Sequence, residues 1–175
     1  MHIIIVGAGP TGLTAGIELM RRGAVVEIID KKKMGSTLSR AVGINPHSLK
    51  LLEASGVTDK LLAEGIPYHA AYFYHGAKAW VTLKLTAASP VQYGYNFMLG
   101  LPQDRTEAIL RDTFEGLGGT LYYDTELKKI TQAEDNVTVI TTEGKQLRSC
   151  REANAKCSTI RYTPWWNVVI LVVAN

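Results

Sequence analysis

Two runs of largely apolar, β-branched residues lie close together at the start of the chain. Residues 2–6 and 24–30 have the pattern of strands buried on both faces of a parallel sheet. Between them Leu13, Ile17 and Met20 recur at helical spacing. The pattern predicts a strand, a helix and a second, parallel strand, joined by the right-handed crossover that such units adopt.

Helical and strand patterns alternate through the rest of the chain as far as residue 148. Asn45-Pro46 has the residue types of a helix N-cap and first helical position. Glu143-Gly144 separates two short β-rich runs, which predicts a hairpin. The predicted helices are 46–56, 59–64 and 102–117, and the predicted strands are 81–85, 120–123, 137–140 and 146–148.

The segment 66–101 is β-rich and aromatic. Residues 81–85 alternate with a period of two, so we expect one face of this strand to be buried and the other to be wet. The aromatic residues between Tyr72 and Phe97 have two interpretations. They fill the face of a sheet, or they line a substrate pocket.

Composition limits the classes of function. The 175 residues are 46% hydrophobic and 20% charged, with a formal net charge of +3, as in a globular domain with its own core. This charge is too small to favour nucleic acid or an anionic membrane as a partner. The longest apolar run, 168–174, is much shorter than the roughly 20 residues of a membrane-spanning helix. With no signal-like stretch at the start, we expect a soluble, cytoplasmic protein.

The cysteines and histidines do not predict a metal site. Cys150 and Cys157 are the only cysteines and lack histidines at zinc-binding spacing, and the four histidines lie on different predicted elements. Residues 149–175 lose the periodic pattern and form an atypical tail. Either 168–173 makes one buried strand, or the tail is foreign sequence from a frameshift or an alternative exon.

Three glycines follow the first strand directly and open the helix: Gly7, Gly9 and Gly12. This spacing fits a dinucleotide pyrophosphate, because the glycines allow a tight turn, close approach of phosphate and close helix–strand packing. The helix N-terminus adds N–H groups and partial positive charge. Asp30 ends the second strand as an exposed carboxylate that can accept hydrogen bonds from ribose hydroxyls. An adenine dinucleotide is predicted, with an unliganded turn as the alternative. Spacing alone does not separate NAD from FAD.

Longer stretches resemble the FAD-dependent aromatic hydroxylases, the p-hydroxybenzoate hydroxylase-like class of flavoprotein monooxygenases. The stretches are 7–15 with 29–31, 39–49, 52–59 and 101–110. The first is shared by many flavoproteins, whereas Ser39-Arg40-Ala41 and Pro102-Gln103 are more specific. The resemblance covers about residues 1–148. It implies an α/β fold, a Rossmann-like FAD-binding domain over 1–148 in which 66–101 is a β-rich insertion on the substrate side.

The resemblance implies further contacts with FAD. In the family an arginine corresponding to Arg40 and a glutamine corresponding to Gln103 meet the cofactor. Their side chains suit phosphate or ribose and a ribitol or ribose hydroxyl, respectively. The alternatives are a surface arginine and a glutamine making local bonds at a helix start. Leu127 brings backbone groups near the adenine or is a core leucine, and Lys31 lies beside the adenosine or in a solvated charge run. The expected cofactor-binding residues are Gly7, Gly9, Thr11, Gly12, Asp30, Lys31, Arg40, Gln103 and Leu127.

The implied function is oxygenation of a small aromatic substrate with FAD as cofactor and NAD(P)H as transient electron donor. No residue can be assigned as catalytic, and the oligomeric state is not determined. Two later Gly-Asp motifs of the family do not occur after residue 148, and family members are longer. We therefore expect a chain that is truncated relative to the family, and weakly active or inactive alone. The alternatives are an NAD-binding dehydrogenase or reductase domain and a non-catalytic nucleotide-binding remnant.

Overall fold

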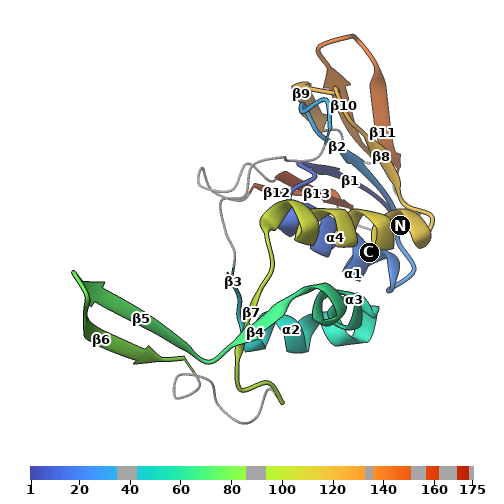
Figure 1. The fold of residues 1–175 in the computed structure, drawn as a ribbon. Coiled ribbons are helices and arrows are strands. Elements are labelled where there is room, and N and C mark those ends of the chain that lie inside the picture. The colour runs from blue at the N-terminus through green and yellow to red at the C-terminus, as the bar shows by residue number, and fades with distance from the viewer. Residues whose placement is uncertain (35–42, 86–93, 133–135, 151–156, 162–168, 174–175) are drawn as a thin grey trace. The chain divides into compact units, whose positions relative to one another are not determined.

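The computed structural model describes residues 1–34, 43–85, 94–132, 136–150, 157–161 and 169–173. The chain divides into two compact units, Met1–Thr37 with Leu110–Asn175, and Leu38–Ile109. Each unit has its own sheets (Figure 1). Within the described residues, no helix is long and apolar enough to cross a membrane.

The first unit is built on a five-stranded sheet in the order β12-β13-β1-β2-β8. Strands β1 (His2–Val6), β2 (Val25–Ile29) and β8 (Thr120–Tyr122) run parallel. The isoleucines of β1 and β2 are fully buried, as predicted for strands covered on both faces. Strand β13 (Val169–Val173) pairs antiparallel with the other edge of β1, and β12 (Cys157–Arg161) pairs antiparallel with β13, so the sheet is mixed. The predicted parallel start and the predicted strand near the end of the chain are both present.

Helix α1 (Pro10–Met20) covers one face of this sheet. Its buried residues include Leu13, Gly16 and Ile17. Gly16 brings the helix close to its neighbours, because a Cβ there would lie 2.8 Å from the ring of Phe114 and 3.1 Å from Cδ1 of Ile28. Phe114 belongs to α4 (Gln103–Gly116), the helix predicted at 102–117, and the boundary between the two units falls within it.

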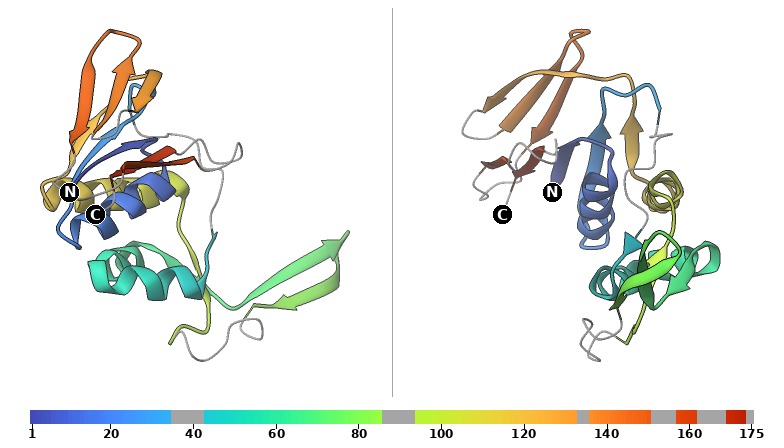
Figure 2. Two further views of the ribbon diagram at one scale, coloured as in Figure 1. Left: turned by 180° about the vertical axis from the view of Figure 1, so that it is seen from behind. Right: turned by 60° about the vertical axis from the view of Figure 1, so that its left-hand side comes forward.

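A three-stranded antiparallel sheet packs on the face of the five-stranded sheet opposite to α1 (Figure 2). It consists of β9 (Leu127–Gln132), β10 (Asn136–Thr141) and β11 (Gln146–Cys150). The predicted hairpin is confirmed: β10 and β11 pair antiparallel, and Gly144 turns the chain with φ +83°. The two sheets share one apolar cluster, which is formed by Ile4, Ile29, Val137, Val139 and Leu147.

The second unit contains two short helices and a small sheet. Helix α2 (Pro46–Leu52) begins as predicted, with the side chain of Asn45 accepting a hydrogen bond from the N–H of Ser48. It tightens into η1 (Glu53–Ser55), and Gly56 with φ +71° leads into α3 (Val57–Glu64). The small antiparallel sheet has the order β3-β7-β4. Its strands are β3 (Gly43–Ile44), β7 (Met98–Gly100) and β4 (Ile66–Tyr68).

A hairpin of β5 (Ala70–His75) and β6 (Lys78–Lys84) forms the remaining sheet of the second unit. The prediction that one face of the strand at 81–85 is buried is wrong. Val81 and Leu83 are 45% and 51% exposed, and Trp80 is 78% exposed. Tyr72, Phe73 and Tyr74 are exposed too, so these aromatic residues fill no core. The alternation was read correctly as a strand, but the hairpin has only its own two strands, and no third element among the described residues covers it.

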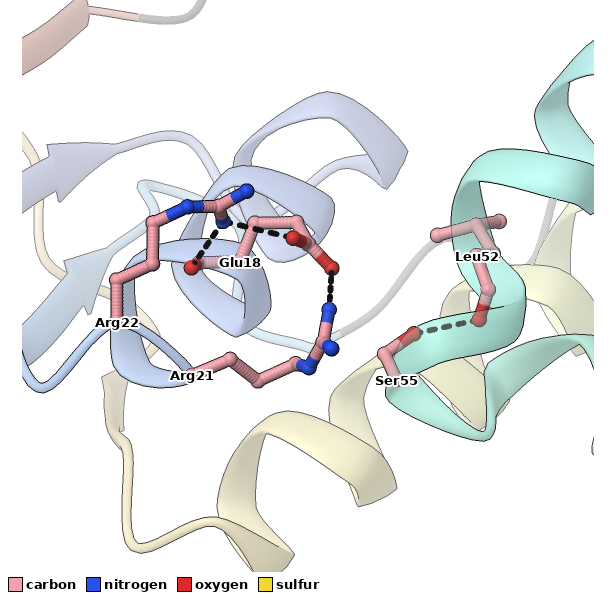
Figure 3. A network of polar contacts seen from close by, with 5 residues as sticks. All are labelled: Glu18, Arg21, Arg22, Leu52 and Ser55. Atoms are coloured by element: carbon pink, nitrogen blue, oxygen red, sulfur yellow. Dashed lines mark hydrogen bonds and ion pairs between the residues drawn. The ribbon is translucent and has the colours of Figure 1, made fainter.

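Side-chain hydrogen bonds lie near the ends of α1 and η1 (Figure 3). Near the end of α1, Glu18 accepts hydrogen bonds from Arg21 and Arg22, each at 2.7 Å. Burial acts to raise the pKa of Glu18, but these two hydrogen bonds outweigh it and leave the pKa below its ordinary value. In the second unit, the hydroxyl of Ser55 donates to the carbonyl of Leu52 at 2.7 Å.

Candidate functional site

The turn between β1 and α1 is tightly closed at its two ends. Gly7 has φ +111°, a conformation that favours glycine, and its N–H donates to the carbonyl of Ile29 at 2.8 Å. A Cβ at Gly12 would lie 1.9 Å from the carbonyl oxygen of Gly7. Because that oxygen belongs to the backbone, it cannot move aside without opening the turn. The first and third glycines are therefore required by the fold of the turn itself.

Gly9, the middle glycine, has no such structural requirement. It is the N-cap of α1 with φ −79° and ψ 179°, which any residue can adopt. A Cβ built on Gly9 would meet nothing within 4 Å. The space beside Gly9 adjoins the start of α1. The first helical hydrogen bond runs from the N–H of Leu13 to the carbonyl of Gly9, so the N–H groups of Thr11 and Gly12 have no partner within the helix. This arrangement fits a phosphate group, which needs both the room and the donors.

Asp30 follows β2 directly and is buried, with 7% of its surface accessible. Its Oδ2 accepts a hydrogen bond from the N–H of Ala8 at 2.7 Å, and its Oδ1 accepts one from the N–H of Lys32 at 2.8 Å. The expectation of an exposed carboxylate is therefore wrong. The reason is that the glycine turn leaves a buried N–H at Ala8, which this carboxylate satisfies.

The carboxylate of Asp30 still has capacity for a ligand. An ionised carboxylate offers about four lone-pair positions, and the two backbone N–H groups use two of them. Ribose hydroxyls could be accepted by the remaining ones. Asp30 can therefore hold the turn through its two backbone hydrogen bonds and still accept hydrogen bonds from a ligand at the end of β2.

The loops after β2 and β8 are joined beside Asp30. Its N–H donates to the carbonyl of Tyr122, and its carbonyl accepts from the N–H of Thr125, both at 2.9 Å. The N–H of Asp124 donates to the carbonyl of Lys32 at 2.8 Å. The pKa of Tyr122 is raised by burial and by its hydrogen bond to Glu27. These loops form one edge at the carboxyl ends of the parallel strands, where ligands of open α/β sheets bind.

The other predicted residues of the first unit lie around this edge. Thr11 is exposed in the first turn of α1, and Lys31 is exposed directly after Asp30. Leu127 begins β9 and packs against the apolar cluster shared by the two sheets. Its side chain thus serves the core, and its backbone pairs with Thr141 of β10.

Gln103, a further predicted residue, belongs to the second unit. Gln103 is the first residue of α4, and its Nε2 donates to Oε1 of Glu107 at 2.7 Å. The local hydrogen bond that was the alternative for Gln103 is therefore present, and it does not test a contact with the cofactor. Arg40 lies outside the described residues. Among the described residues, no group of histidine, cysteine and acidic side chains could hold a metal ion.

Sequence analysis missed four residues at these positions. Ala8 contributes only a backbone N–H, which no side-chain pattern reveals. Asp124 and Thr125 follow a strand, and aspartate is one of the few residues that accept a positive φ, here +51°. Glu107 stands four residues after Gln103, the spacing at which helical side chains meet. The residue type of Asp124 and the spacing between Gln103 and Glu107 are visible in the sequence and could have been used.

Comparison with known proteins agrees with this geometry. Residues 1–152 match the FAD binding domain family. The chain is 31% identical over 147 residues to a rifampicin monooxygenase of Rhodococcus hoagii, covering 84% of this chain and 29% of that protein. It is 35% identical over 137 residues to the 6-methylpretetramide 4-monooxygenase of Streptomyces rimosus, covering 78% of this chain and 24% of that protein.

The fold is similar to that of a solved flavoprotein. A ternary complex of aklavinone-11 hydroxylase with FAD and aklavinone superposes with a TM-score of 0.71 and 26% identity, covering 84% of this chain and 31% of that one. The chain thus spans less than a third of the length of these proteins. The family match favours FAD over the alternative of an NAD-binding dehydrogenase. With its α/β fold, glycine turn and matched residues 1–152, the chain belongs to the FAD binding domain family of the flavin-dependent aromatic monooxygenases.

Proposed function

We propose that the turn Gly7–Gly12 and the carboxylate of Asp30 hold the ADP half of FAD. The pyrophosphate lies beside Gly9 at the start of α1, and the adenosine ribose lies beside Asp30. The observation that carries this proposal is the contrast between two glycines of one turn. A Cβ at Gly12 would meet backbone at 1.9 Å, whereas a Cβ at Gly9 would meet nothing within 4 Å.

Further contacts complete the proposed cofactor site. Thr11 borders the pyrophosphate, and Lys31 and the backbone of Leu127 flank the adenosine. Gln103 and Arg40 make further contacts with the cofactor. In this proposal residues 1–148 form the cofactor-binding domain with 66–101 as the insertion on the substrate side, and 149–175 form a tail.

We further propose that this domain holds FAD for the oxygenation of a small aromatic substrate with electrons from NAD(P)H, in the cytoplasm where that donor is available, and that the 175 residues alone are weakly active or inactive. The support is that both curated relatives are named monooxygenases and that the hydroxylase complex holds FAD and aklavinone. When bound, FAD supplies the oxygen-transfer chemistry. The residues of this chain bind and orient it: backbone N–H groups of α1 neutralise phosphate charge, and Asp30 fixes the ribose.

The test replaces the two contrasting glycines. Gly9→Ala should leave the free energy of unfolding within about 0.5 kcal/mol of the starting value, because the new methyl group touches nothing. It should weaken FAD binding about ten- to a hundred-fold, because the methyl group occupies the phosphate's place and removes hydrogen bonds to a charged group. Gly12→Ala should instead destabilise the protein strongly. Urea unfolding and FAD titration by calorimetry give both quantities.

Gly116→Ala is the matched control. A Cβ there also meets nothing within 4 Å, and this glycine ends α4 rather than opening α1. It should leave FAD binding unchanged and should not lower the free energy of unfolding, because alanine is a better helix former than glycine. A Gly9→Ala protein that binds FAD as tightly as the original chain would place the pyrophosphate elsewhere. Tight NAD binding by the original chain with no measurable FAD binding would contradict the proposed cofactor.

A further inference from the structure

We propose that Asp124 is a positioning residue, whose left-handed backbone conformation holds the carboxylate of Asp30 in the orientation that accepts the ribose of the cofactor. This inference rests on the proposed function, in which Asp30 contacts the adenosine ribose of FAD. All the residues that carry the inference belong to the first unit. Asp124 acts here through its backbone, and its own carboxylate has no part in the proposal.

Asp124 has an unusual backbone conformation. Among the described residues it is the only residue other than glycine with a positive φ, at +51°. Aspartate is tolerated in this conformation, whereas a β-branched residue is strained there. A residue keeps such a conformation only where its surroundings determine it, so the contacts around Asp124 must define this turn.

The turn brings two successive N–H groups to the segment that follows β2. The N–H of Asp124 donates to the carbonyl of Lys32 at 2.8 Å, and the N–H of Thr125 donates to the carbonyl of Asp30 at 2.9 Å. Because peptide groups are planar, only the two backbone angles of Asp124 set these N–H groups relative to each other. A residue that avoids positive φ would turn one N–H away from its carbonyl, so at least one of the two hydrogen bonds would be lost.

These two hydrogen bonds hold the segment after β2 on both sides of a donor to Asp30. They fix two peptide groups, the one that follows Asp30 and the one that follows Lys32. The peptide group between these carries the N–H of Lys32, which donates to Oδ1 of Asp30 at 2.8 Å. With Ala8 donating to Oδ2 at 2.7 Å, both oxygens have fixed directions. The remaining lone pairs of the carboxylate are therefore aimed before a ligand arrives, which lowers the cost of binding.

The experiment compares variants of position 124 in the 175-residue chain, with FAD affinity measured by calorimetry. Asp124→Gly and Asp124→Asn remove the carboxylate but accept positive φ, so FAD affinity should stay within about two-fold of the original. Asp124→Val removes the same charge but resists positive φ. Its FAD affinity should fall about three- to ten-fold, because the oriented carboxylate is less populated. Asp124→Ala is less strained and should show a smaller loss in the same direction.

Glu143→Val is the matched control. It removes a carboxylate from another exposed turn of the first unit, at a residue without positive φ. Its FAD affinity should equal that of the original chain.

A measurement without FAD tests the backbone directly. The amide proton of Lys32 should exchange with solvent faster in Asp124→Val than in Asp124→Gly or Glu143→Val, as followed by nuclear magnetic resonance at a temperature where these variants are folded. The amide proton of Ile28, in the buried strand β2, should change less. This comparison separates local release of the segment after β2 from a general loss of stability.

Combination with Asp30→Asn tests whether the effect acts through Asp30. The single oxygen of asparagine should face the buried N–H of Ala8, which leaves the N–H of Lys32 without its acceptor. In this background Asp124→Val should therefore cause less than about two-fold further loss of FAD affinity.

The possible failures are distinguishable. If Asp30→Asn binds FAD as tightly as the original chain, the ribose contact fails and the positioning role falls with it. If Asp30→Asn weakens binding but Asp124→Val does not, or if exchange at Lys32 is the same in Asp124→Val and Asp124→Gly, only the positioning role is overturned. Equal losses of affinity in Asp124→Gly and Asp124→Val would also overturn it, because the carboxylate of Asp124 would then carry the effect. So would a full effect of Asp124→Val in the Asp30→Asn background.

Discussion

Replacement of Asp30 separates two tasks of one side chain, because the residue is both a member of the fold and a proposed cofactor contact. Its two oxygens accept hydrogen bonds from the backbone N–H groups of Ala8 and Lys32. Each hydrogen bond to a charged group is worth about 1.5–3 kcal/mol. Asp30→Asn keeps one acceptor oxygen and turns an NH₂ group toward a donor. It should therefore lower the free energy of unfolding by about 1.5–3 kcal/mol.

Asp30→Ala should have the larger effect. It removes both acceptors and leaves the buried N–H of Ala8 without a partner, while the N–H of Lys32 is part-buried and regains some hydration. We expect a loss of about 2.5–5 kcal/mol, which is a large share of the 5–15 kcal/mol typical of a folded domain. The asparagine variant is therefore the better protein for binding measurements. Its FAD affinity should fall by about 1.5–3 kcal/mol, since ribose hydroxyls lose a charged acceptor.

The assay is urea unfolding followed by circular dichroism, together with FAD titration of the folded variants. Asp112→Asn is the control, because Asp112 is exposed and its ion pair with Nε of Arg111 is long, at 3.6 Å. An unchanged free energy of unfolding in Asp30→Ala would refute the reasoning, since it would mean that Ala8 and Lys32 gain nothing from the carboxylate. Lost stability with unchanged FAD affinity in Asp30→Asn would confine Asp30 to the fold.

Three further outcomes are expected. Gly16→Ala should destabilise the protein by about 1–3 kcal/mol in thermal unfolding, because its Cβ would press on the ring of Phe114 at 2.8 Å; an unchanged melting temperature would mean that this contact relaxes freely. The stability difference between the original chain and Glu18→Gln should be about 0.5–1 kcal/mol at pH 7, since the pKa of Glu18 is lowered in the fold. It should be fully present above the ordinary pKa of 4.5 and vanish as the pH falls through the lowered pKa of Glu18, and a difference that grows in acid would contradict this sign. Finally, the 175-residue chain should bind FAD weakly and yield peroxide rather than hydroxylated phenol when supplied with NAD(P)H, because a large ligand is normally 70–90% buried. Oxygen uptake with product analysis checks this, and stoichiometric hydroxylated product would contradict it.

The sequence predicted the elements whose patterns are local. The glycine spacing, the Asn45 cap and the Gly144 turn each depend on residues close together in the chain, and each appears in the structure. The burial of Asp30 depends on a partner 22 residues away. Its strand-end position predicted an acceptor, but nothing near it in the sequence showed that Ala8 needed one.

Burial in the 66–101 segment was not predictable for a related reason. A period of two identifies a strand and its two faces, but it does not say whether another element covers either face. Val81 and Leu83 have the alternation of a half-buried strand and are exposed. The same is true of the candidate site. The glycine turn was visible in the sequence, whereas the sequence offered several possible partners for Gln103 and did not single out Glu107.

The arrangement of the first unit has a consequence for how the chain folds. This unit is discontinuous, since Met1–Thr37 packs with residues from Leu110 onward and the second unit lies between them in sequence. During synthesis the apolar strands β1 and β2 emerge first, but the cluster that covers Ile4 and Ile29 needs Val137 and Val139. Closing so long a loop costs entropy before any contact repays it, which slows folding. The glycine turn is thus among the first segments made, and the early strands stay open to misassociation until Val137 and Val139 have been synthesised.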